Sequence, residues 1–173
     1  MPNASLYDCV KNVNNAYRTA LMNRKYYGYR LSAVKTWNTA MEIAIAVGTS
    51  SAIGAWAIWR STSVGANVWA ILAGLATLFA VVKPCLKLSK RVEKYSELFV
   101  GHGDVYYDLK TITMELTRFR DYTDKIDEAF RRTIERIKQL ALKDDPKINE
   151  KLRRRSFEEV KREIPVESLW WPT

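Results

Sequence analysis

One acid and three hydroxyl residues near the middle of the chain are the candidates for chemistry. Glu42 directly precedes a stretch without charge, residues 43–59, which contains the three hydroxyls. They belong to Thr49, Ser50 and Ser51. Carboxylate rings favour cations, and hydroxyls can line a wet path through apolar surroundings, so these four are pore-lining candidates. Plainer interpretations stay open: Glu42 can pair with Lys83, and the hydroxyls can bond to carbonyls of the preceding helical turn.

The other reactive side chains lack the partners that catalysis or metal binding needs. His102, the single histidine, lies between two glycines with no general base at a useful spacing. Cys9 and Cys85 lie far apart in the sequence, so we expect free thiols and no metal site. The stretch GHGDVY at 101–106 lacks the third glycine of a dinucleotide-binding loop and follows a helical pattern. We therefore expect no enzyme and no cofactor.

Two apolar runs must position the pore-lining candidates. Residues 43–59 and 61–82 carry no charge, and only Arg60 separates them. As helices they would reach about 25 Å and about 33 Å, which brackets a hydrocarbon core of about 30 Å. A hairpin buried inside a soluble protein would have to be surrounded by other apolar residues, and the rest of this chain is too polar to supply them. The sequence thus predicts a transmembrane helical hairpin at 39–84, with spans at about 41–59 and 64–83.

The net charge of +9 is concentrated on both flanks of this hairpin. The flanking bases are Arg18, Arg24, Lys25, Arg30 and Lys35 before it, and Lys83, Lys87, Lys90, Arg91 and Lys94 after it. By the positive-inside rule, both termini of a multi-pass membrane protein are expected in the cytoplasm. Anionic headgroups account for this distribution, which does not favour direct nucleic-acid binding. We expect no cleaved signal peptide, because the first apolar run starts behind a long polar segment.

The segment 1–38 is predicted to be a cytoplasmic amphipathic helix. Its apolar residues from Leu6 to Val34 follow alternating spacings of three and four, with Arg24 at the one position that interrupts the pattern. Four aromatic residues lie near its membrane end and are expected to be interface anchors or packing residues. They are Tyr26, Tyr27, Tyr29 and Trp37.

The segment 85–142 is predicted to hold a cytoplasmic stalk followed by a heptad helix. We expect the glycines at 101 and 103 to end the stalk. Beyond them, apolar residues keep three–four spacing from Leu109 to Leu140 over about four heptads. This stripe can pack against the N-terminal helix, which gives a bundle, or against its own copies, which gives a coiled coil.

The segment 143–173 is a charged tail that begins at Asp144-Asp145-Pro146, holds a short helix around Arg154 and ends in two adjacent tryptophans. Exposing both rings is costly, so Trp170 and Trp171 are expected to bury against the bundle, the lipid interface or a partner. We take them as partner-docking candidates.

Helix contacts and bending are predicted at four positions. Gly48, Gly54 and Gly74 lie among small residues that let helix backbones approach closely, within the hairpin or between copies. We therefore expect a homo-oligomer. Pro84 ends the second span and is the expected hinge, because it cannot donate to the carbonyl of Ala80.

The order of these parts, over roughly residues 6–142, resembles the SLATT superfamily of small bacterial two-span effectors. That family has no catalytic signature, so the resemblance assigns no residue. It implies a membrane effector of anti-phage defence by abortive infection, which perturbs or permeabilises the bacterial inner membrane when triggered. It also implies a cytoplasmic partner protein, a nucleotide-signal or reverse-transcriptase module. The alternative function is a non-conducting membrane scaffold or adaptor that recruits a soluble enzyme.

Overall fold

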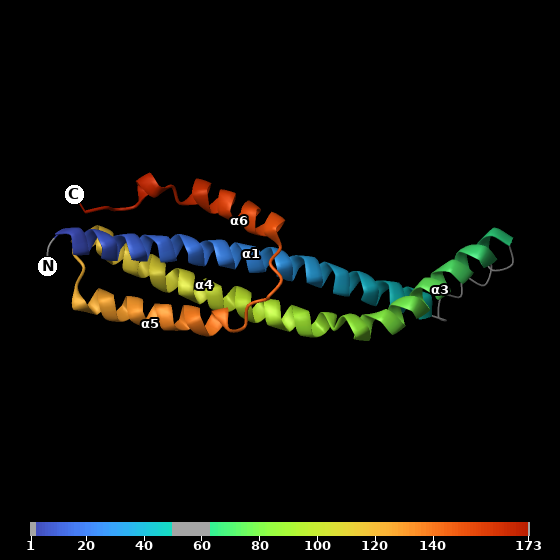
Figure 1. Cartoon of the computed structure of the whole chain (residues 1–173). Coiled ribbons are helices and arrows are strands. Elements are labelled where there is room, and N and C mark those ends of the chain that lie inside the picture. The colour runs from blue at the N-terminus through green and yellow to red at the C-terminus, as the bar shows by residue number, and fades with distance from the viewer. Residues whose placement is uncertain (1–2, 50–62, 173) are drawn as a thin grey trace. The chain divides into compact units, whose positions relative to one another are not determined.

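The computed structural model describes residues 3–49 and 63–172, and it is helical throughout with no strand in these two ranges. Its α-helices are α1 (Asn3–Thr49), α3 (Ser63–Leu86), α4 (Leu88–Phe119), α5 (Asp124–Ala141) and α6 (Glu150–Glu163), followed by the 3-10 helix η1 (Val166–Ser168) (Figure 1). The predicted all-α class is therefore confirmed for the described residues.

The helices form two compact units. The bundle unit consists of Met1–Arg30 and Lys94–Thr173, and the hairpin unit consists of Leu31–Glu93. Each unit receives part of α1 and part of α4. The units thus divide after residues 30 and 93, whereas the predicted segment boundaries lie after residues 38 and 84.

The core of the bundle unit joins four helices. Its buried apolar residues come from the predicted stripes of α1 and α4 and from α5 and α6. They are Val10, Val13, Tyr17, Ala20, Leu21, Val105, Leu109, Ile112, Leu116, Ile126, Val160 and Ile164. Figure 1 shows α5 and α6 on opposite sides of the N-terminal part of α1. The stripes therefore pack within one chain, which is the bundle alternative.

The expected helix end at 101–103 is wrong, because α4 runs through both glycines. A Cβ added to Gly101 would lie 2.5 Å from Leu140 Cδ2, so this glycine lets α5 approach α4 closely. His102 between them is buried, with 2% of its surface exposed. Helix contact, not helix termination, explains the first of these glycines.

The single heptad helix from Leu109 to Leu140 is also wrong, because the stripe is split between α4 and α5. Arg120 adopts a left-handed conformation with φ of 52°, which ends α4. The side chain of Thr123 then caps α5 by accepting a hydrogen bond from the Ile126 amide. The two halves of the stripe fold back on each other and on α1.

The hairpin unit holds the end of α1, all of α3 and the start of α4. Among the described residues, no single helix combines the length and apolarity needed to cross a membrane. One pair of helices meets this criterion when it is taken together, by length and composition alone. It consists of Ala70–Leu86 and Leu88–Phe119, which are bent by 47° at the break between them. The membrane hairpin stays a prediction.

Candidate functional site

Glu42 and Lys83 form an ion pair in the hairpin unit. Lys83 Nζ donates to Glu42 Oε1 at 2.8 Å, and Asn38 Nδ2 donates to the same oxygen at 3.0 Å. About half of the Glu42 side chain stays exposed, at 52%. The predicted pairing of Glu42 with Lys83 is therefore present.

The remaining pore-lining and packing candidates are only partly described. Gly48 and Thr49 are the last two residues of α1, and their side-chain surroundings lie outside the described part, as do Ser50, Ser51 and Gly54 altogether. Gly74 is described, and a Cβ added to it would meet no atom within 4 Å. Among the described residues, none covers the face of α3 that carries Gly74.

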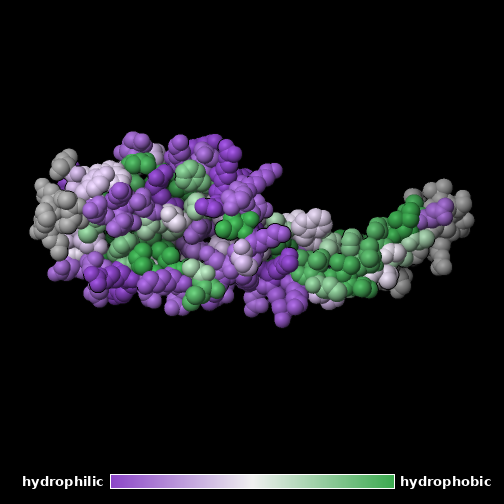
Figure 2. Space-filling model, in the orientation of Figure 1, coloured by the Kyte–Doolittle hydropathy of each residue, from purple (hydrophilic) through white to green (hydrophobic). Residues whose placement is uncertain are grey.

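Large apolar side chains cover the outside of the hairpin unit. On α3 they recur at three- and four-residue intervals, which places them along one face of the helix. The exposed residues are Trp37, Ile43 and Val47 on α1, and Val68, Ile71, Leu75, Leu78 and Val81 on α3. In Figure 2 the visible face of α3 is mostly hydrophobic. A contiguous exposed surface of this kind is typical of contact with lipid or with another protein.

The bend after this apolar surface lies at Lys87, three positions beyond the predicted hinge. Pro84 is inside α3, which continues to Leu86. Lys87 then adopts φ of 47° and its amide donates to the Pro84 carbonyl at 3.2 Å. Pro84 frees the carbonyl one turn before it, but the left-handed residue is what separates α3 from α4.

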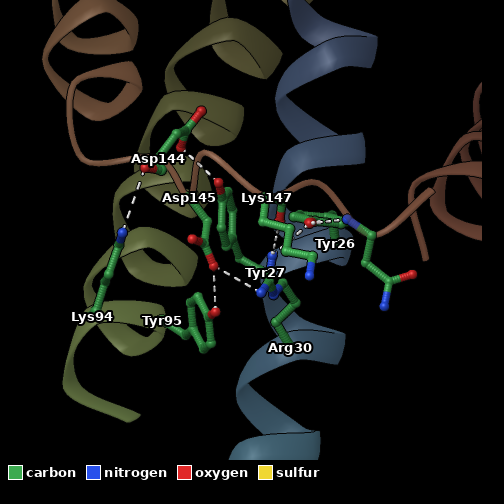
Figure 3. Close-up of polar contacts among 9 residues, drawn as sticks. Tyr26, Tyr27, Arg30, Lys94, Tyr95, Asp144, Asp145 and Lys147 are labelled. Atoms are coloured by element: carbon green, nitrogen blue, oxygen red, sulfur yellow. Dashed lines mark hydrogen bonds and ion pairs between the residues drawn. The ribbon is translucent and has the colours of Figure 1, made fainter. Parts of the chain in front are cut away.

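A second site, in the bundle unit, joins α1, α4 and the linker between α5 and α6 (Figure 3). Asp145 of this linker forms an ion pair with Arg30 Nη2 at 2.8 Å and accepts a hydrogen bond from the Tyr95 hydroxyl at 2.6 Å. Arg30 also donates through Nη1 to the Tyr26 hydroxyl and to the Lys147 carbonyl. We call the residues around Asp144 and Asp145 the linker site.

Asp144 occupies the other half of the linker site. It accepts a 2.7 Å hydrogen bond from the Tyr27 hydroxyl, and its carbonyl accepts one from Lys94. Burial alone would raise the pKa of Asp144, but His102 and Tyr27 outweigh this effect and lower the pKa. Burial, followed by the Asp144 carboxylate, raises the pKa of Tyr27. The carboxylate is therefore held in its charged form.

His102 lies beneath this linker and stacks on Tyr27, with ring centroids 5.3 Å apart and planes at 2°. Its Nε2 is 3.8 Å from Asp144 Oδ1, beyond hydrogen-bond distance. Neither ring nitrogen has a hydrogen-bond partner among the described residues. The imidazole is thus a buried polar group that lies near the linker but receives no hydrogen bond from it and donates none to it.

Sequence reasoning missed the linker site. Tyr26 and Tyr27 are expected either at a lipid interface or in packing, and the structure buries both in the bundle unit. Tyr29 donates instead to Glu159 of α6. The sequence signal that could have revealed the site is the pair Asp144-Asp145 beside a proline, because two adjacent carboxylates at a helix end need hydrogen-bond donors. Tyr27, Tyr95 and Arg30 are these donors in the structure.

The tryptophans at the C-terminus lie on the bundle unit. Trp170 packs against its core, and its carbonyl accepts a hydrogen bond from the buried Asn14 side chain at 3.2 Å. Trp171 lies 5.7 Å from Tyr7 between ring centroids and donates to the Val166 carbonyl. Of the three predicted surroundings, which are the bundle, the lipid interface and a partner, the structure places the two rings against the bundle unit. Docking of a partner on their remaining exposed surface stays a prediction.

Comparisons of the chain with protein-family models, curated proteins and solved structures found no match.

Proposed function

We propose that this chain is a membrane effector whose hairpin unit inserts into the bilayer while the bundle unit stays in the cytoplasm. The observation that carries the proposal is the exposed apolar surface of the hairpin unit, from Trp37 to Val81. Lys83, Lys87, Lys90 and Arg91 follow it directly, as expected where a span meets anionic headgroups.

The effector would act as an oligomer. Two helices cannot enclose water, so conduction requires several copies, with Glu42 of each copy near the mouth of a cation path. Gly74 supports contact between copies, because nothing described in the same chain occupies the space beside it. The resemblance to the SLATT superfamily extends this proposal to abortive anti-phage defence with a separate cytoplasmic partner.

Topology is the first test. In a background without other cysteines, Ser63→Cys should react with an impermeant maleimide from outside intact cells, while Cys9 should react only after lysis. Release of the protein from membranes by a carbonate wash, or external labelling of Cys9, would overturn the membrane proposal.

Oligomerisation can be tested at Gly74 without disturbing the single chain. Gly74→Leu should leave helix content unchanged, because no described atom lies within 4 Å of a Cβ at this position. It should weaken crosslinking between copies in membranes, since a bulky residue holds two helix backbones apart and costs about 1–2 kcal/mol where they would otherwise pack. Gly74→Ala is the matched control. A wild type that is monomeric in detergent and does not crosslink in membranes would contradict the oligomer.

Conduction is tested by membrane potential in cells expressing the chain. The wild type should depolarise the membrane once activated, and Glu42→Gln should change ion selectivity without changing expression. Glu93→Gln, the same change elsewhere in the hairpin unit, should leave selectivity intact. An activated wild type that leaves the potential untouched would favour the scaffold alternative.

A further inference from the structure

In the linker site, hydrogen-bond donors of α1 and α4 surround two carboxylates of the same chain. Tyr27 and Arg30 of α1 and Tyr95 of α4 converge on the carboxylates of Asp144 and Asp145 (Figure 3). All three donors are largely buried, with exposed fractions of 4% for Tyr27, 4% for Tyr95 and 18% for the Arg30 side chain. Removing the linker would take from these buried donors the two carboxylates that they contact, which is costly.

His102 shows that the linker does not use the whole site. Only 2% of its surface is exposed, it approaches Asp144, and it has no hydrogen-bond partner on either nitrogen among the described residues. A carboxylate carries two oxygens in one plane, and Asp144 already uses Oδ1 for Tyr27. A tetrahedral group with more oxygens could reach both Tyr27 and the imidazole.

We propose that Tyr27, Arg30, Tyr95 and His102 form a binding site for a phosphate-bearing anion, and that Asp144 and Asp145 occupy it as an internal competitor. Phosphate suits the site because it carries up to two negative charges and several strong acceptor oxygens, and because guanidinium pairs with it in a bidentate manner. Its binding would expel residues 142–149, the linker that ties α6 to α5. The proposal goes beyond the membrane function and does not depend on it.

The test is calorimetric titration of pyrophosphate into the full chain in a neutral detergent at constant ionic strength. Asp144→Asn with Asp145→Asn keeps the shape of the linker but removes its charge. It should therefore tighten pyrophosphate binding about tenfold or more, because the competent state is no longer masked. Arg30→Gln should abolish binding in both backgrounds.

Asp127→Asn is the matched control. Asp127 also accepts from a tyrosine and an arginine, Tyr122 and Arg131, but lies outside the linker site. Its substitution should leave pyrophosphate affinity unchanged. Equal tightening by this control, or no tightening by the Asp144 and Asp145 pair, would overturn the proposal.

Hydrogen exchange on the wild type decides the question if the double variant fails to fold. Millimolar pyrophosphate should accelerate exchange at residues 142–149 and leave the α4 core around Leu109 protected. Unchanged exchange at 142–149 would overturn the proposal, and chloride at the same ionic strength controls for screening. The assay needs no bilayer, so its failure is distinguishable from failure of the membrane function.

Discussion

Lys83 Nζ lies 2.8 Å from Glu42 Oε1, although 41 positions separate the two residues in the sequence. The pair joins the last part of α1 to the last part of α3. The sequence predicts this pairing from a turn near residues 61–62, which places Glu42 opposite Val82 and Lys83. The relationship is one that charge exchange can test.

Reversing one charge of this pair should weaken the hairpin unit, and reversing both should restore it. Glu42→Lys and Lys83→Glu each place like charges side by side, whereas the double variant recreates attraction with the signs exchanged. The measurement is the midpoint of thermal unfolding in detergent. Glu93→Lys controls for the change in net charge. A double variant no more stable than the two single ones would show that the pair does not stabilise the hairpin unit.

The two glycines of α4 should respond to substitution in opposite directions. Gly101→Val should lower the free energy of unfolding by about 1–3 kcal/mol, because its side chain meets Leu140. Gly103→Ala should raise it by about 0.5–1 kcal/mol, since Arg24, at 3.6 Å, leaves room and alanine favours a helix. Denaturant titration measures both. Stabilisation by Gly101→Val would contradict the close approach of α5.

Gly101 and Gly103 show a limit of prediction from apolar periodicity. The apolar spacing predicts helical structure correctly for the described residues, because one face of each helix must be buried. It does not reveal whether glycine ends a helix or admits a neighbour, since that depends on Leu140, far along the chain. The turn at Arg120 was hidden for a related reason: Thr123 fits the apolar spacing, although the acids Asp124 and Asp127 after it are a helix-start signal.

Acid should loosen α6 from α1 through Glu159. Its hydrogen bond from Tyr29 lowers the pKa of Glu159, burial opposes this, and Arg155 and Lys25 add to it. A lowered pKa in the folded state means that the stabilisation is complete above the ordinary value of about 4.3 and is lost as pH falls through the folded value. Hydrogen exchange across 150–163 should accelerate over that window.

Glu159→Gln should remove this acid dependence, while Glu158→Gln, its exposed neighbour, should retain it. Equal acid sensitivity in the wild type and Glu159→Gln would show that another group attaches α6.

Trp170 should contribute to the stability of the bundle unit. Trp170→Ala is expected to lower the free energy of unfolding by about 2 kcal/mol, less than for a fully buried tryptophan. Trp171→Ala should cost less, because its ring rests on the exposed Tyr7. Denaturant titration checks both. An unchanged stability for Trp170→Ala would mean that its ring serves another surface, such as a partner.

The candidate sites were predictable to different degrees. The pairing of Glu42 with Lys83 could be predicted from the sequence. In a hairpin with a short turn, residues that are equally many positions from the turn lie at the same depth. The linker site could not be predicted, because Tyr27 and Asp144 are 117 positions apart and no local spacing connects them. Only the burial of Tyr27 and His102 in the folded bundle brings their polar groups to the linker.

The core of the bundle unit is closed by contacts between the two ends of the chain. Tyr17 bonds to Tyr106 across 89 positions, and Asn14 to Trp170 across 156. During synthesis at about 5–20 residues per second, the apolar stripe of α1 therefore leaves the ribosome roughly 5 to 20 s before its α4 partner. The stripe must be shielded or tolerated in water over that interval. We expect a chaperone that covers α1 to raise the yield of folded chain while leaving the finished structure unchanged.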